Sequence, residues 1–330
     1  MAQVASEPII GPEQLRGPEV GGEPSQQVVG RSPGQLFWRR FRRDRFALGG
    51  IVFIVLMLLA AVGAPLFARL TSHGPNEVFG AGALSDIGLP VGPSGTFWFG
   101  ADTAGGDLFV RVIYGARTSL TVALLATGIS LVIGVVLGLL AGYYRGKVDT
   151  FISRLTDVVL SLPILLLALG LAAACGASKE GCLGGVVRPG LLLVSYIIGL
   201  FNWPYIARIV RGQTLSLREK EFVEAARAQG ASDLRIMFRE VLPNIAAPII
   251  VYTTLIIPNN ILFEAALSFL GVGLPPTVPS WGRMLADAST IFTVAWWTML
   301  FPGLFLFLTT LAFNLVGDGL RDALDPRTAR

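Results

Sequence analysis

Residues 119–142 read SLTVALLATGISLVIGVVLGLLAG and contain no charged side chain and no proline. A hydrocarbon core about 30 Å thick is crossed by a helix of about 20 apolar residues, so this stretch is long enough to span a membrane. The stretch therefore predicts a transmembrane helix, and the rest of the chain repeats its character.

The composition excludes a water-soluble globule. Of the 330 residues, 53% are apolar and 15% charged, whereas soluble domains carry about 25% charged residues. The net charge of +4 is a weak signal for nucleic acid, because arginines crowd just before an apolar run, as a cytoplasmic membrane flank does. These arginines are Arg39, Arg40, Arg42, Arg43 and Arg45. We expect contact with membrane lipid and none with nucleic acid.

Six apolar segments are long enough to cross the membrane. They are Ala47–Phe67, Ser119–Gly142, Phe151–Ala174, Leu191–Val210, Ile245–Leu270 and Phe292–Val316. The fold class is thus an all-α membrane protein with six transmembrane helices. Cytoplasmic loops are enriched in Lys and Arg, which predicts cytoplasmic N- and C-termini. Of the 26 basic residues, that orientation leaves outside only Arg69, Arg111, Arg117, Lys179, Arg188 and Arg283.

This topology divides the chain into five parts. Residues 1–33 are rich in Pro, Gly and Gln and predict a disordered cytoplasmic tail. An interfacial helix and the first span follow at 34–68, then an extracytoplasmic loop at 69–117. The five-helix core occupies 118–317, with an inner loop at 211–244, and 318–330 form a cytoplasmic tail.

The side chains of hydrolases and metalloproteins are scarce. His73 is the only histidine, which excludes metal sites built from several histidines, and we expect no catalytic residue and no metal site. Cys175 and Cys182 are the only cysteines, and both lie in an expected outer segment. A disulfide between them is predicted because an oxidising compartment permits it, two inert thiols being the alternative.

The inner loop carries the most specific pattern. Helix-forming residues run up to Gln229, Gly230 can end that helix with a positive φ, Ser232 or Asp233 can cap a second short helix, and Pro243 is expected to stop it. The loop therefore predicts two short helices joined at Gly230.

Small side chains on the first of these helices suggest a docking element. Ala225, Ala226 and Ala228 let the backbone enter a partner's groove, and Glu224 and Arg227 would orient it through charge. A helical hairpin without a partner is the alternative.

This loop resembles the EAA loop of ABC-importer permeases. Glu224-Ala225-Ala226, then Gly230, then Leu242-Pro243 follow the family's spacing, although Glu240 stands where the family prefers isoleucine. Further runs are similar to the second (C-type) permease of dipeptide, oligopeptide and nickel importers, and the resemblance covers about 35–325. These runs are Phe97–Asp102, Arg111–Leu120, Glu264–Gly273 and Pro279–Gly282.

The resemblance implies a permease subunit in the cell membrane, with the type I ABC-importer permease architecture, that imports di- and oligopeptides. It would work with a second homologous permease, two cytoplasmic ABC ATPases and an extracytoplasmic substrate-binding lipoprotein. ATP and Mg²⁺ would bind those ATPases, since Gly146-Lys147 lacks the remaining P-loop residues. The residues implied to couple to the ATPase are Glu224, Ala225, Ala226, Arg227, Gly230, Leu242 and Pro243. Import of nickel or another small solute, a stand-alone secondary transporter, and a membrane enzyme are the alternatives.

Polar residues inside a span indicate a substrate pathway. Asn259, Asn260, Glu264 and Ser268 lie in the fifth span, and the last three, spaced by four, share one helix face. They predict contact with the peptide's amine and amide groups, and the alternative is hydrogen bonding between helices.

Overall fold

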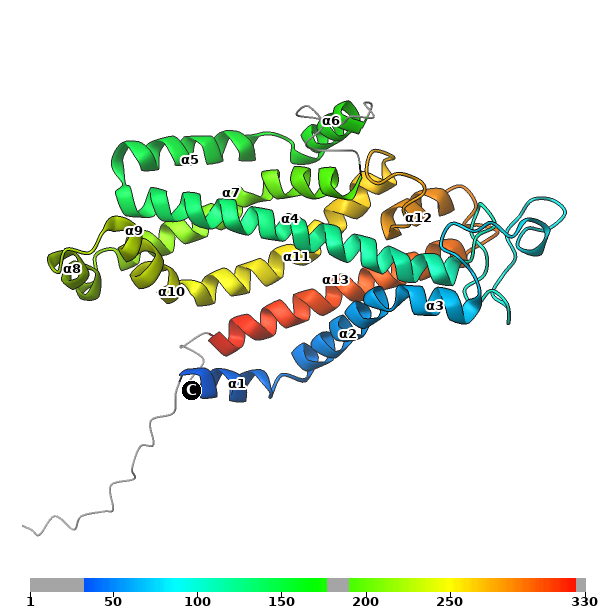
Figure 1. Ribbon diagram of the computed structural model, residues 1–330, viewed down its shortest axis with the longest axis horizontal. Coiled ribbons are helices and arrows are strands. Elements are labelled where there is room, and N and C mark those ends of the chain that lie inside the picture. The colour runs from blue at the N-terminus through cyan, green and yellow to red at the C-terminus, as the bar shows by residue number, and fades with distance from the viewer. Residues whose placement is uncertain (1–32, 177–189, 325–330) are drawn as a thin grey trace, which may run out of the picture.

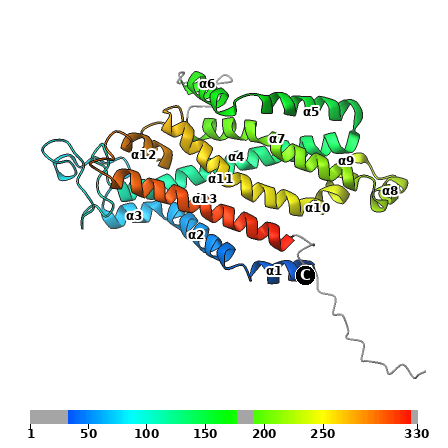
Figure 2. The same ribbon diagram turned by 180° about the vertical axis from the view of Figure 1, so that it is seen from behind.

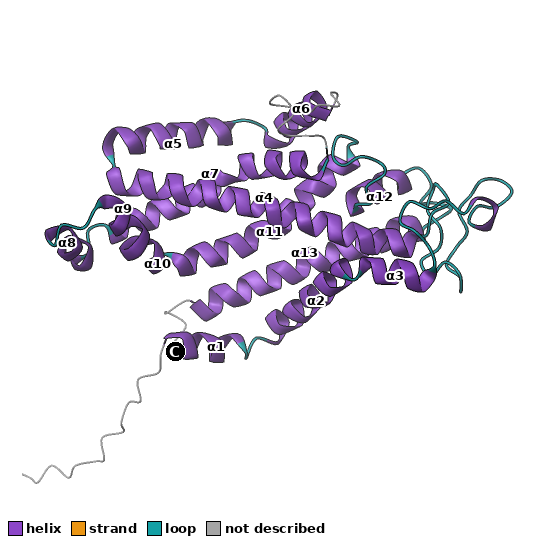
Figure 3. Ribbon diagram, viewed as in Figure 1, coloured by secondary structure: helices purple, strands orange, loops and turns teal. Residues whose placement is uncertain are grey.

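Long apolar helices run side by side along the molecule (Figure 1). The computed structural model describes residues 33–176 and 190–324. Five helices there are long and apolar enough to cross a membrane, namely α2 (Arg45–Val62), α4 (Leu108–Tyr144), α7 (Leu191–Leu217), α11 (Ala246–Phe269) and α13 (Trp297–Leu324). Within the described ranges the only β pairings are two isolated bridges, so the expected all-α class is confirmed (Figure 3).

The predicted third span is divided into two helices. α5 (Gly146–Ser161) and α6 (Ile164–Gly176) meet at an angle of 83°. Pro163 disfavours helical backbone in the preceding residue, and Leu162 is extended at φ −84° and ψ 142°. The predicted span Phe151–Ala174 is therefore bent at Leu162 and Pro163, and six spans are present if this bent pair crosses the membrane as one.

The other predicted spans differ mainly at their ends. The first is interrupted at Gly63, where α2 gives way to α3 (Ala64–Thr71). The second begins eleven residues earlier than predicted, and α4 at 37 residues is about 55 Å long, so it projects beyond the ~30 Å apolar layer. The fifth is matched by α11 to within one residue at each end.

A helix, α1 (Pro33–Phe41), is present where an interfacial helix is expected, and its place at the membrane interface stays a prediction. Its Phe41 is buried in a cluster with Ala47 and Ala323, so the helix rests against the last turn of α13. Asp44 then starts α2, because its carboxylate accepts hydrogen bonds from the Phe46 and Ala47 amides.

The two ends of the molecule have different content. One end carries α1, the last turn of α13 and the short helix α8 (Glu221–Ala228) (Figures 1 and 2). The opposite end carries α3, the loop over residues 72–107 with its short 3₁₀ helix η2 (Gly80–Gly82), and α12 (Trp281–Ala288). The inner loop, α1 and the end of α13 thus share one end of the molecule, as the predicted topology requires, and the side of the membrane on which that end lies stays a prediction.

Candidate functional site

The inner loop presents α8 as an exposed helix held by one buried side chain. Val223 is fully buried in a cluster with Ile236 and Met237. Glu224 and Ala225, on the other side of the helix, are exposed. The packing fixes α8 from within the molecule and leaves its outer face open.

The turn after α8 is made by backbone conformation. Gly230 has φ +78°, and a Cβ added there would meet nothing within 4 Å, so the position requires glycine for its left-handed backbone and not for space. The next elements are α9 (Asp233–Arg235), the π-helical turn η3 (Ile236–Val241) and α10 (Leu242–Asn244).

Two details of the predicted loop need correction. Pro243 was expected to stop the second helix, yet it lies in the first turn of α10, where the missing amide hydrogen costs no intrahelical bond. Ser232 is the N-cap of α9, but its side chain makes no capping hydrogen bond. The chain thus passes from α8 to α11 as a series of short helical turns.

The residues predicted to couple to an ATPase lie at this end in two groups. The first group is Glu224, Ala225, Ala226 and Arg227 on α8, followed by Gly230 in the exposed turn. The second group is Leu242, half-buried against the core beneath the loop, and Pro243, which is exposed.

An ion pair also joins the end of α4 to the inner loop. Arg145, after α4, pairs with Glu219 before α8, and this hydrogen bond lowers the pKa of the Glu219 carboxyl. Both side chains are largely exposed, so the pair adds little stability.

Three of the four predicted pathway residues are buried between helices. Asn260 donates to Thr127 Oγ1 of α4 at 2.8 Å, and its carbonyl oxygen accepts from Asn202 of α7 at 2.8 Å. Glu264 accepts from Ser119 of α4 and from Ser268, each at 2.8 Å. The alternative of interhelical hydrogen bonding describes these contacts, and the pathway role stays a prediction.

Asn259 lies apart from this set. Its side chain is exposed and bonds only within its own helix, donating to the Leu255 carbonyl at 3.2 Å. Among the four residues it alone faces away from the packed helices in this conformation.

The predicted disulfide cannot be placed. Cys175 is buried near the end of α6, against a cluster that includes Val194 and Ile198. Cys182 lies outside the described residues, so the pairing stays a prediction.

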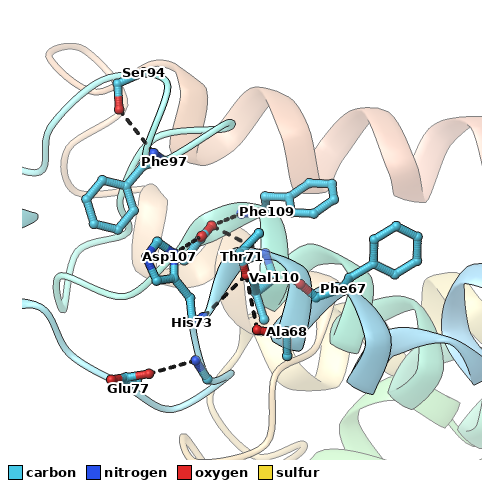
Figure 4. Close-up of polar contacts among 11 residues, drawn as sticks. Phe67, Ala68, Thr71, His73, Glu77, Ser94, Phe97, Asp107, Phe109 and Val110 are labelled. Atoms are coloured by element: carbon cyan, nitrogen blue, oxygen red, sulfur yellow. Dashed lines mark hydrogen bonds and ion pairs between the residues drawn. The ribbon is translucent and has the colours of Figure 1, made fainter.

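At the opposite end, His73 fixes the outer loop to α4, a contact that the sequence analysis missed (Figure 4). Its Nδ1 lies 2.6 Å from Asp107 Oδ2, and its ring packs on Phe79 and Phe97. Asp107 also caps α4, because Oδ1 accepts from the Phe109 amide at 2.9 Å. An aspartate directly before an apolar helix is a recognisable N-cap signal, whereas its pairing with a distant histidine leaves no trace in sequence spacing.

Segments that resembled one importer branch come together at this end. Trp281 is fully buried and donates from Nε1 to the Val112 carbonyl at 3.1 Å. A Cβ at Gly115 would meet the Trp281 ring at 3.0 Å, and one at Gly282 would meet Ala265 at 2.3 Å. These short runs of sequence therefore pack against one another, which is why small residues in one run lie opposite large or backbone atoms of another.

Two family models match the chain. Residues 134–330 match the binding-protein-dependent transport system inner membrane component, and residues 32–81 match the N-terminal transmembrane domain of oligopeptide transport permease C. The first match covers the inner loop and more than half of the chain.

Curated relatives are similar over nearly the whole length. The chain is 40% identical to the dipeptide transport system permease protein DppC of Alkalihalophilus pseudofirmus, covering 98% of this chain and 97% of the relative. It is 41% identical to the di/tripeptide permease DppC of Pseudomonas aeruginosa (91% and 94% covered) and 39% identical to the glutathione permease GsiD of Pectobacterium atrosepticum (90% and 92%).

A solved structure shares the fold. An inward-facing conformation of the MetNI methionine ABC transporter matches with a TM-score of 0.52 at 20% identity, covering 66% of this chain and 96% of that one. At this identity the likeness concerns the helix arrangement alone.

Proposed function

The chain belongs to the inner-membrane components of binding-protein-dependent transport systems, and from this we propose that it is the permease through which an ABC importer takes up short peptides. Membership makes it a non-catalytic, multi-pass subunit of the cell membrane. It also implies that ATPases and a substrate-binding protein work with it.

In this proposal α8 is the coupling helix that docks into the ATPase. The observation that carries it is an exposed face with Glu224 and Ala225, fixed from beneath by the fully buried Val223. Small side chains admit close approach of a partner, and charges at the rim orient it. A helix that only closed a hairpin would gain stability by burying its apolar side chains, yet Phe222 is 38% exposed.

The energy for transport comes from outside this chain in the same proposal. Two cytoplasmic ATPases would bind ATP and Mg²⁺, and their closure would move the coupling helices of this subunit and of a second, homologous permease. ATP can shift the transporter between inward- and outward-facing states only by the difference in its affinity for the two.

The cargo that we propose is a di- or oligopeptide. The relatives named as dipeptide and di/tripeptide permeases support this class. Glutathione is the second candidate, because a relative of nearly equal identity is named as its permease. Nickel or another small solute would use the same machinery.

We propose Asn259 as the first pathway residue to test, because its amide is exposed near the middle of α11. Asn260, Glu264 and Ser268 would meet a peptide only after α11 separates from α4, since their polar atoms bond within the helix pack.

Gly230 provides the test of coupling. Gly230→Val forces a β-branched residue into a left-handed backbone and should reorient α8, whereas Gly230→Asn should retain most function because asparagine tolerates this conformation. We expect Gly230→Val to lower ATP-driven uptake at least about tenfold, equivalent to about 1.4 kcal/mol, or to release the ATPase.

The assay uses the complete importer in proteoliposomes, with the ATPases, second permease and binding protein present. Uptake of a labelled dipeptide, of glutathione and of Ni²⁺ is measured in parallel with ATP hydrolysis and with ATPase retention on the purified complex. Normal uptake and retention in Gly230→Val would refute the coupling role. Uptake of Ni²⁺ without the dipeptide would refute the peptide assignment, and uptake of glutathione without the dipeptide would assign the cargo to that tripeptide.

A further inference from the structure

Tyr143, next to last in α4, is buried beneath the inner loop. The side chain is 3% exposed and belongs to the same cluster as Val223, Ile236 and Met237. This cluster joins the end of α4 to α7 and to α8 and η3, the last two lying about 80 to 100 positions after Tyr143 in the sequence. A shift of the inner loop would therefore displace the Tyr143 side chain directly.

The Tyr143 hydroxyl connects the two sides of the Gly230 turn. It donates to Asp233 Oδ1 at 2.7 Å and accepts from Arg227 Nη2 at 3.3 Å. Arg227 lies at the end of α8 and Asp233 at the start of α9. One phenol oxygen therefore holds the end of α8 and the start of α9 in a fixed relation to α4.

The guanidinium groups of Arg218 and Arg227 both contact Tyr143. Arg218 donates to the Tyr143 carbonyl oxygen, and its guanidinium carbon lies 5.8 Å from the ring centroid. The Arg227 carbon lies 5.7 Å from that centroid. Cations at this distance from an aromatic face are attracted to it, so the phenyl ring and the hydroxyl make separable contacts with the loop.

The close packing of α4 on α7 gives this connection a longer reach. α4 packs along α7 with glycines at the contact, and side chains added there would collide with α7. Helices in such close contact move as a unit, because packed interiors do not deform continuously. A displacement applied at Tyr143 is therefore passed to both long helices.

We propose that Tyr143 is the positioning residue that transmits movement of α8 to the α4–α7 pair. This rests on the proposed coupling function of α8. The Arg145–Glu219 ion pair joins the same two regions, but its side chains are 43% and 67% exposed, and an exposed pair of this kind holds little geometry. The part-buried hydrogen bonds of the Tyr143 hydroxyl are the stronger link.

Tyr143→Phe tests the proposal in the complete reconstituted importer. The substitution removes both hydroxyl contacts and keeps the ring under Arg218 and Arg227. We expect the ATPase to stay bound at normal stoichiometry and its KM for ATP to stay unchanged. Peptide taken up per ATP hydrolysed should fall about tenfold, the factor expected for losing a hydrogen bond to a charged group.

Glu219→Gln is the matched control, because it removes a polar contact of the same loop without touching Tyr143. It should leave uptake per ATP within about twofold of wild type, as the small contribution of an exposed ion pair implies. Asp233→Asn, at an exposed position, weakens the same hydrogen bond from the other side and should reproduce the loss. Combined with Tyr143→Phe, it should add little, as expected for two partners of one contact.

Wild-type uptake per ATP in Tyr143→Phe would overturn the proposal. If that variant does not assemble, Asp233→Asn decides in its place, and normal coupling there overturns the proposal equally. Loss of coupling in Gly230→Val together with normal coupling in both of these variants would refute the Tyr143 role and leave the coupling function of α8 standing.

Discussion

At the scale of single residues, three glycines determine how closely α4 and α7 approach. Gly134, Gly138 and Gly142 recur every four positions on α4 and face α7. A Cβ at Gly138 would lie 2.7 Å from Val210 Cβ and 2.8 Å from the Ala207 carbonyl oxygen. Backbones this close allow no side chain between them, which is the arrangement that small residues spaced by four favour in membranes.

Gly138→Ala should therefore destabilise the subunit. Overpacking of a closed contact costs about 1–3 kcal/mol, more than the ~1 kcal/mol gained from the better helix propensity of alanine. Gly128→Ala, on the same helix with nothing within 4 Å, should leave stability unchanged or raise it. Thermal unfolding of the two variants in detergent measures the difference, and equal midpoints would contradict the tight contact.

The sequence indicated part of this contact. Gly134 and Gly138 form a GxxxG pair, and that spacing is readable in any helix. The partner surface of Val210 and Thr214 is not readable, because a periodic pattern describes one helix and carries no information on its neighbour. The same limit hid the contacts of Tyr143, because α5, α6 and α7 separate it in the sequence from its partners Arg227 and Asp233.

At the scale of elements, α4 depends on the cap at its outer end. Asp107 is fully buried, its Oδ1 accepts hydrogen bonds from the first-turn amides of α4, and its Oδ2 bonds to His73. Loss of an N-cap costs about 1 kcal/mol, and a buried polar partner left unsatisfied adds about 1–3 kcal/mol.

Asp107→Ala should thus lower the free energy of unfolding by about 2–4 kcal/mol and loosen the outer loop from α4. Hydrogen exchange at the amides of Phe109 and Val110 reports the first effect locally, and limited proteolysis of the 72–107 loop reports the second. Asp86→Ala, at an exposed position of the same loop, serves as the control. Protection as slow as in wild type would show that the cap does not stabilise α4.

Prolines show why the elements were predicted only in part. Pro204, Pro258 and Pro302 are buried inside continuous helices, whereas Pro163 is exposed and lies at the break between α5 and α6. Neighbouring helices can re-satisfy the carbonyls that a buried proline frees, and an exposed proline has no such support. Hydropathy finds apolar segments well, but whether a proline interrupts one depends on packing that the sequence does not state.

At the scale of the whole molecule, the buried polar residues of α11 form hydrogen bonds to the neighbouring helices α4 and α7 in this conformation. The sequence grouped Asn260, Glu264 and Ser268 on one face, and they do share it. That face turns toward Thr127 and Ser119 of α4. A helical face can be derived from spacing, but the element that it faces depends on the crossing of whole helices, so a stripe between two spans and a stripe along a pathway look alike in sequence.

The neighbours Asn259 and Asn260 separate the two roles by experiment. Asn260→Ala removes a fully buried amide that bridges α7, α11 and α4, so it should cost about 1–3 kcal/mol of stability. Asn259→Ala removes an exposed amide and should leave the free energy of unfolding within about 0.5 kcal/mol of wild type. If Asn259 contacts the passing peptide, its loss should reduce uptake by the assembled importer several-fold at unchanged stability, because a polar partner of the cargo is missing.

Uptake and thermal unfolding are therefore measured on the same two preparations. Unchanged uptake in Asn259→Ala would remove this residue from the pathway, and an unchanged midpoint in Asn260→Ala would show that the bridge between the three helices is not a source of stability.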